Sequence, residues 1–205
     1  MVREVRIYIE GGGDRSDTKA AIREGFNGFL HPLRELAQQR GVRWSLIACG
    51  TRRNAFESFK IALEQHPEAF NVLLVDSESR VSRSPWEHLR NEDGWDVAEL
   101  SESQCHLMVH TVEAWLVADP MTLAAFYGQG FLQNALPRRV DVEEIDKEQL
   151  FRSLERATRQ SHKGEYHKIR HCSLLLKLLV QERVRSRARH CDLLFTTLEA
   201  KITAE

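Results

Sequence analysis

The chain has 205 residues, which is enough for one α/β domain or for such a domain with a helical appendage. Hydrophobic residues make up 42%, charged residues 29%, and the net charge is -1, as in an ordinary soluble globular protein. No apolar run is long enough to span a bilayer, and the amino terminus resembles a charged strand rather than a signal peptide. The four cysteines form no Cys-x-x-Cys pair, which excludes the usual zinc and disulfide patterns and favours a reducing cytoplasm.

The first part of the chain alternates strand-forming and helix-forming segments. Apolar, β-rich runs predict strands at residues 5–10, 44–49, 71–76 and 105–110. Helical patterns occupy residues 16–40, with Ser16 or Asp17 as the cap, and residues 55–65, 84–89, 111–119 and 121–127. Residues 91–95 indicate a turn. This order predicts an α/β fold with a mostly parallel four-stranded sheet flanked by helices and right-handed crossovers.

The character of the sequence changes after residue 135. Helices are predicted at about residues 147–159, 168–180 and 188–202, and no convincing strand follows. We therefore expect an α/β core over residues 1–135 and a helical extension over residues 136–205 that packs on it. Between Phe151 and His190, eleven Lys or Arg stand against three acids, which indicates either a solvated helical surface or a phosphate-binding face.

Carboxylates follow the predicted strands at the point where each strand ends. Asp76 and Glu78 come directly after a buried apolar strand, and in an extended chain they would point to the same side. Glu10 and Asp14 bracket three glycines after the first strand, and Glu113 follows the fourth. The carboxyl ends of parallel strands meet at one edge of a sheet, so these five groups are expected to share a crevice.

Five carboxylates in one crevice would repel one another strongly unless cations neutralise them. Oxygen ligands of this kind suit Mg²⁺ or Mn²⁺, and their number allows one ion or two ions about 4 Å apart. The sequence therefore indicates a metal site, and two ions there could activate a water and stabilise the departing oxygen of a phosphodiester.

Each candidate also has a simpler interpretation. Asp76 and Glu78 could end a strand in a solvated acidic turn, Glu10 could be a turn acid, and Glu113 could interact with a helix dipole. The glycine run could approach a phosphate but lacks the Lys-Ser/Thr of a P-loop. His106 and His110 could be ligands, although packed strand histidines are the simpler choice, and Lys168 could contact a phosphate or be an ordinary surface lysine.

The order of these motifs resembles the Toprim domain of topoisomerases, primases and OLD-type nucleases. The resemblance is closest to the OLD nucleases, in which an acid pair, an acid-x-acid motif and a hydroxyl-x-Glu motif follow in the order seen here. The whole chain resembles small bacterial Toprim-like proteins of the domain-of-unknown-function 4276 family. The shared landmarks are Glu10-Gly11-Gly12-Gly13-Asp14 (preceded here by Ile9 in place of the family's Val), Leu73-Leu74-Val75-Asp76-Ser77-Glu78, Gln104-Cys105-His106-Leu107-Met108, Val112-Glu113-Ala114-Trp115, Ala125-Phe126-Tyr127-Gly128 and Tyr166-His167-Lys168.

The resemblance implies a Toprim-like, Rossmann-like fold and Mg²⁺-dependent phosphodiester hydrolysis, with nucleic acid as substrate and an ATPase partner in phage defence. Glu10 would act as general acid or base and as a metal ligand. Asp76 and Glu78 would bind the principal ion, Asp14 and Glu113 a second ion, and Lys168 would stabilise transition-state charge. Glu78 stands where Toprim domains usually have Asp, which changes the reach of that carboxylate.

Two other functions are compatible with the sequence. One is a non-catalytic module that binds a metal or phosphate in the crevice and docks on a larger ATPase. The other is a different phosphoryl-transfer enzyme that uses Asp76 as a phosphoacceptor, but this leaves the glycine run and Glu113 without a role.

Overall fold

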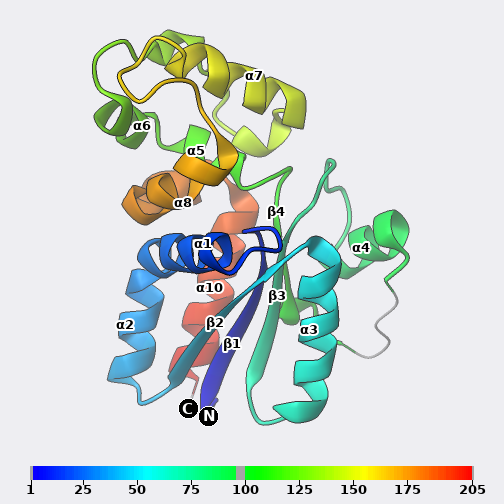
Figure 1. Cartoon of the computed structure of the whole chain (residues 1–205). Helices are drawn as coiled ribbons and strands as arrows, with labels where there is room; N and C mark the ends of the chain where they lie inside the picture. The colour runs from blue at the N-terminus through cyan, green and yellow to red at the C-terminus, as the bar shows by residue number, and fades with distance from the viewer. Residues whose placement is uncertain (1, 96–99, 205) are drawn as a thin grey trace.

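The computed structural model describes residues 2–95 and 100–204, and its centre is a four-stranded parallel sheet with the strand order β2-β1-β3-β4 (Figure 1). The strands are β1 (Glu4–Glu10), β2 (Arg43–Gly50), β3 (Phe70–Asp76) and β4 (Cys105–Met108). The parallel pairing confirms the predicted α/β sheet and places β1 and β3 side by side at its centre.

Helices cover the sheet and continue the chain beyond it. They are α1 (Ser16–Phe29), α2 (His31–Gln39), α3 (Arg52–Gln65), α4 (Pro85–Asp93), α5 (Glu113–Ala118), α6 (Pro120–Tyr127), α7 (Lys147–Thr158), α8 (Lys168–Leu178), α9 (Gln181–Arg185) and α10 (Arg189–Thr203). Short 3-10 turns occur at Glu102–Gln104, Gln133–Ala135 and Val142–Glu144.

The two faces of the sheet bury separate apolar clusters, because side chains alternate along each strand. Ile7 and Ile9 of β1 belong to the cluster that includes residues of α1, α2, α8 and α10. Tyr8, between them, belongs to the cluster formed with α3 and α4. Figure 1 shows α1, α2 and α10 on one face of the sheet and α3 on the other.

Helices α5 to α8 lie beyond the carboxyl ends of the strands, at the upper edge of the sheet in Figure 1. Helix α8 crosses α1 closely because glycines face it. A Cβ atom on Gly25 would stand 2.6 Å from the carbonyl oxygen of Ser173, and one on Gly28 would stand 2.9 Å from Cα of Lys177. The close crossing fixes the first turn of α8, with Lys168, above the edge where the strands end.

The single helix predicted for residues 16–40 is wrong, because the structure has two helices there. Helix α1 ends at Phe29 and α2 begins at His31, with Pro32 in the first turn of α2. Proline has no N–H to donate and its ring clashes with the preceding turn, so the first helix cannot continue through it. The predicted cap is also wrong: Arg15 occupies the N-cap position of α1 and makes no side-chain cap hydrogen bond.

Other boundaries differ by a few residues. Strand β4 ends at Met108 rather than residue 110, and α4 runs through Asp93, so that only Gly94 and Trp95 remain of the predicted turn. The sequence pattern missed the five-residue helix α9. Among the described residues, no helix is both long and apolar enough to cross a membrane.

Candidate metal centre

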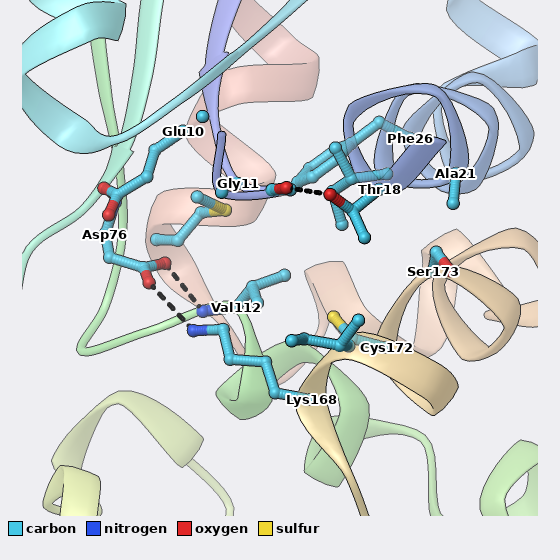
Figure 2. A pocket seen from close by; sticks show the side chains of 16 residues that line it. Glu10, Gly11, Thr18, Ala21, Phe26, Asp76, Val112, Lys168, Cys172 and Ser173 are labelled. Carbon is cyan, nitrogen blue, oxygen red and sulfur yellow. Dashed lines mark hydrogen bonds and ion pairs between the residues drawn. The ribbon is translucent and has the colours of Figure 1, made fainter. Parts of the chain in front are cut away.

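Glu10 and Asp76 are the last residues of the two central strands and lie against each other. The backbone N–H of Asp76 donates a hydrogen bond to Glu10 Oε2 at 3.1 Å. The carboxylate of Asp76 is buried and accepts the backbone N–H of Val112 at 2.9 Å (Figure 2). Backbone N–H groups at the end of β3 and just before α5 therefore fix both carboxylates at the carboxyl edge of the sheet.

Glu78 joins them through a turn and not through an extended chain. Its φ is 64°, which is an uncommon conformation for a residue other than glycine. The backbone N–H of Ser77 donates to Met108 and that of Glu78 to His110, both at 2.9 Å. The carboxylates of Glu10, Asp76 and Glu78 each place one oxygen within 4.8 Å of the others. We call these three residues the acidic triad.

Lys168 lies on the other side of Asp76. Its Nζ is 3.6 Å from Asp76 Oδ2 (Figure 2) and 3.5 Å from Glu113 Oε2. Glu113 is completely buried and also accepts a hydrogen bond of 2.8 Å from the hydroxyl of Tyr166. Its carboxylate thus positions Lys168, whose side chain is half exposed, over the acidic triad.

Arg52 approaches the triad from the start of α3. Its Nε and Nη2 donate to the carboxylate of Asp93 at 2.9 and 2.7 Å, and the guanidinium lies 5.3 Å from the centre of the Trp95 ring. Nη1 is 4.0 Å from Glu10 Oε2 and has no hydrogen-bond partner among the described residues. Because Asp93 engages Nε and Nη2, the Nη1 amino group is left oriented toward the site.

Burial shifts the protonation of the two central acids. Burial raises the pKa of Asp76 from its ordinary 3.8 to about 8, and the carboxylates of Glu10 and Glu113 add to this effect while Lys168 opposes it. The pKa of Glu10 is also raised, chiefly by burial. Burial disfavours the charge on Lys168, but the carboxylates of Asp76 and Glu113 outweigh it and raise the pKa of the lysine.

The structure brings together some of the predicted site residues and leaves others apart. Glu10, Asp76, Glu78 and Lys168 meet at one point. Asp14 is exposed in the glycine loop and Glu113 points to Tyr166 and Lys168, so neither belongs to the acidic triad. His106 is buried in β4 with Nε2 against the carbonyl of Ser103, as expected for a packed strand histidine.

Sequence reasoning overlooked Arg52 and Lys147. Arg52 comes directly after Gly50-Thr51 at the end of β2, so the rule that located the acids at strand ends could also have identified this cation. Lys147 begins α7 and forms an ion pair with Glu78 Oε2. No local signal links Lys147 to a residue 69 positions earlier, since the contact depends on how α7 is placed.

A cavity of about 290 Å³ opens beside the acidic triad, between α1 and α8 (Figure 2). Glu10, Asp76 and Lys168 line the part nearest the triad, together with the glycines at 11–13. The rest of its wall is mostly apolar. Its apolar part is formed by Ala21, Ile22, Phe26, Met108, Val112, Ile169 and Cys172.

Residues 9–199 match a domain of unknown function, DUF4276, which covers most of the chain. The chain belongs to the DUF4276 family. Comparison with curated proteins and with solved structures gives no match. The DUF4276 match includes every residue of the acidic triad as well as Arg52, Glu113 and Lys168, so the whole candidate site lies within the family domain.

The donor set of the site suits a metal ion. The acidic triad offers three carboxylates, and hard divalent cations such as Mg²⁺ prefer oxygen ligands. Asp76 is buried and Glu10 is partly buried, and both pKa values are raised, so the neighbouring Lys168 and Arg52 do not fully offset the cost of their negative charges. A cation bound between them would supply additional positive charge, and this DUF4276 site could therefore bind a metal.

Proposed function

We propose that this protein hydrolyses phosphodiester bonds in nucleic acid with the help of Mg²⁺ or Mn²⁺ bound by the acidic triad. The observation that carries the proposal is the convergence of the three carboxylates, from two strand ends and a left-handed turn, within 4.8 Å. Two cationic side chains, Lys168 and Arg52, flank them. Acids that bind a metal, with fixed cations for a phosphate beside them, form an arrangement suited to phosphoryl chemistry.

Each side chain has a part in this proposal. Asp76 and Glu78 hold the ion, and Glu10 both contributes an oxygen and takes a proton from water, a task that its raised pKa favours. Lys168 Nζ and Arg52 Nη1 donate to the phosphate oxygens as negative charge develops. When bound, the ion supplies Lewis-acid polarisation of a phosphoryl oxygen and lowers the pKa of a bound water.

One ion is sufficient for this arrangement. The predicted second site needs Asp14 and Glu113, and neither lies in the acidic triad. Glu113 is instead a positioning residue, because it holds Lys168 next to Asp76. The protein's own cation at this point takes the place of a second metal in balancing the charge.

Basic residues of the helical part support nucleic acid as the substrate, although fewer of them are free than the sequence suggested. Arg183 pairs with the buried Asp119, and Arg187 donates to the carbonyls of Val117 and Ala118. These two stabilise the fold.

Arg152, Arg156 and Arg159, on α7 and directly after it, are exposed and line a shallow surface depression that also contains acidic residues. Arg152 pairs with Glu148 and Arg159 with Glu165. We propose that these arginines exchange their exposed ion pairs for contacts with the nucleic-acid backbone.

The test is hydrolysis of labelled single-stranded and duplex DNA and RNA in Mg²⁺ or Mn²⁺. Wild-type protein should cleave at least one of them, chelation should stop cleavage, and Glu10→Gln and Asp76→Asn should each lower the rate by about 100-fold or more. Glu64→Gln, an exposed acid on α3, is the matched control and should retain the wild-type rate. Cleavage that survives in both site variants would contradict the proposal.

A second candidate is a non-catalytic module that binds a metal or phosphate and docks on an ATPase. The ion pairs of Lys147 with Glu78 and of Lys168 with Asp76 favour it, because these cations already neutralise part of the acidic charge. The family resemblance supports an ATPase partner and a role in phage defence. Mn²⁺ binding together with stable ATPase binding, but without cleavage by the complex, would favour this candidate.

A further inference from the structure

The cavity between α1 and α8 extends beyond the acidic triad and has apolar walls, which a metal site alone does not need. Close to the triad its wall is polar, with Glu10, Asp76 and Lys168, whereas most of the remaining wall is apolar. Figure 2 shows Ala21 of α1 and Ser173 of α8 at the end away from Glu10 and Asp76. A molecule held at the triad by a charged group would therefore place its neighbouring group in an apolar pocket.

Helix packing explains why this space stays open. The α1–α8 crossing is tight at Gly25 and Gly28, where the backbones almost touch, and the helices separate toward Thr18 and Lys168. Ala21 is the small residue at the start of this separation. The cavity is thus a consequence of two helices fixed at one end of their contact and apart at the other.

The glycine loop lines the cavity without adding side chains to its wall. Gly11, Gly12 and Gly13 all have positive φ, and a Cβ on Gly12 would come within 2.7 Å of the Cα of Lys19. The loop is held down by the hydrogen bond from Gly11 N–H to the carbonyl of Gly50 at 2.8 Å. Opposite the loop, Ile169 is 66% exposed although it lines the cavity. Its apolar surface is available to an incoming ligand.

We propose that this cavity accepts one nucleobase of the substrate, next to the phosphate held at the acidic triad. The inference rests on the proposed function and specifies its substrate. Apolar walls suit the faces of a base, and hydroxyl and backbone groups of Thr18, Ser173 and the glycine loop can bind its edges. Lys168, beside Asp76, complements the negative phosphate.

A base that enters this cavity must leave its stack in a duplex. The preferred substrate is therefore single-stranded nucleic acid, or a nucleotide at an end or loop, because unstacking one base of a duplex costs a few kcal/mol. Contacts between protein side chains and a single base contribute about 1–3 kcal/mol, which is about a 5- to 150-fold effect on binding.

The test measures binding by calorimetry in the presence of Mn²⁺, with nucleoside 5′-monophosphates and with ribose 5-phosphate, which lacks the base. Wild-type protein should bind at least one nucleotide about tenfold or more tightly than the sugar phosphate. Ala21→Phe fills the cavity and should remove this difference while leaving Mn²⁺ and ribose 5-phosphate binding unchanged. Ala20→Phe, on the exposed side of the same helix, should behave as wild type.

Ser173→Leu narrows the cavity from the opposite helix and should have the same effect if Ala21→Phe fails to fold. Equal affinities of the wild type for nucleotides and ribose 5-phosphate, with normal Mn²⁺ binding, would overturn the base pocket and leave the metal site intact. A preference that survives both cavity variants would overturn it as well. Wild-type protein that binds no Mn²⁺ would overturn the proposed function and the base pocket together.

Discussion

Asp76 is the residue whose environment depends most on whether a cation is present. Its carboxylate is buried between Glu10 and Lys168, accepts one backbone N–H and has a pKa raised to about 8. At neutral pH the metal-free site therefore retains a proton, and a metal must displace it. The residue combines a structural position, at the end of β3, with a charge that the protein alone does not fully stabilise.

This shift predicts a pH dependence of the metal-free protein. The folded state binds more protons than the unfolded chain between about pH 4 and 8, so the free energy of unfolding should fall as pH rises through this range. The slope from one group is at most about 1.4 kcal/mol per pH unit. Urea unfolding in chelator should show a larger fall between about pH 5 and 8 for wild type than for Asp76→Asn. Parallel profiles of the two proteins would contradict this account.

Glu78 shows what the sequence could and could not predict at this scale. The acid-x-acid spacing correctly suggested that Asp76 and Glu78 converge. The expected reason, an extended chain with alternating side chains, was wrong, because Glu78 adopts a φ of 64°. A left-handed conformation of a residue other than glycine depends on surrounding hydrogen bonds, here those to β4 and His110, and no local pattern encodes it.

The pair α1–α8 is the element contact that shapes the candidate site. It joins two helices that are far apart in the sequence. For example, Lys177 Nζ of α8 bonds to Glu24 of α1, 153 positions earlier. The contact sets both the position of Lys168 and the width of the cavity. Its closeness depends on Gly25 and Gly28, which the helical pattern alone would treat as weak points.

Gly25→Ala therefore tests the helix contact. On an isolated helix alanine would be favoured over glycine by about 1 kcal/mol. Here the added Cβ would stand 2.6 Å from the carbonyl oxygen of Ser173, so the variant should instead lower the unfolding free energy by about 1–3 kcal/mol. Urea unfolding measures this change. Arg23→Ala, on the exposed side of α1, should change it by less than about 0.5 kcal/mol. A more stable Gly25→Ala variant would show that α1 and α8 are farther apart.

How well each helix or strand was predicted depends on its length and on the residues that mark its ends. The buried strands β1, β2 and β3 were located to within a residue or two, because their apolar runs end at glycine or at acids. The break between α1 and α2 was missed although Pro32 signals it, since the apolar stripe continues across it through Phe29, Leu30 and Leu33. Helix α9 has five residues, too few for a helical period to be detected.

At the scale of the whole molecule, the parallel sheet explains why distant residues meet. Strands β1 and β3 are adjacent, so the acids at their ends, 66 positions apart, are neighbours. The predicted parallel sheet was therefore enough to predict that Glu10 and Asp76 lie close together. The placement of α5 to α8 above this edge was not predictable. It determines that Glu113 lies apart from the triad and bonds to Tyr166, and that Lys147 pairs with Glu78, so these contacts could not be predicted either.

The central claim is that Glu10, Asp76 and Glu78 bind a divalent metal ion, and a crystal of the protein soaked in Mn²⁺ tests it most directly. The account predicts an anomalous peak bonded to carboxylate oxygens of these three residues, with water completing an octahedral shell. The peak should be absent from an Asp76→Asn crystal soaked in the same way. Wild-type crystals that show no peak at this position at saturating Mn²⁺ would contradict the claim.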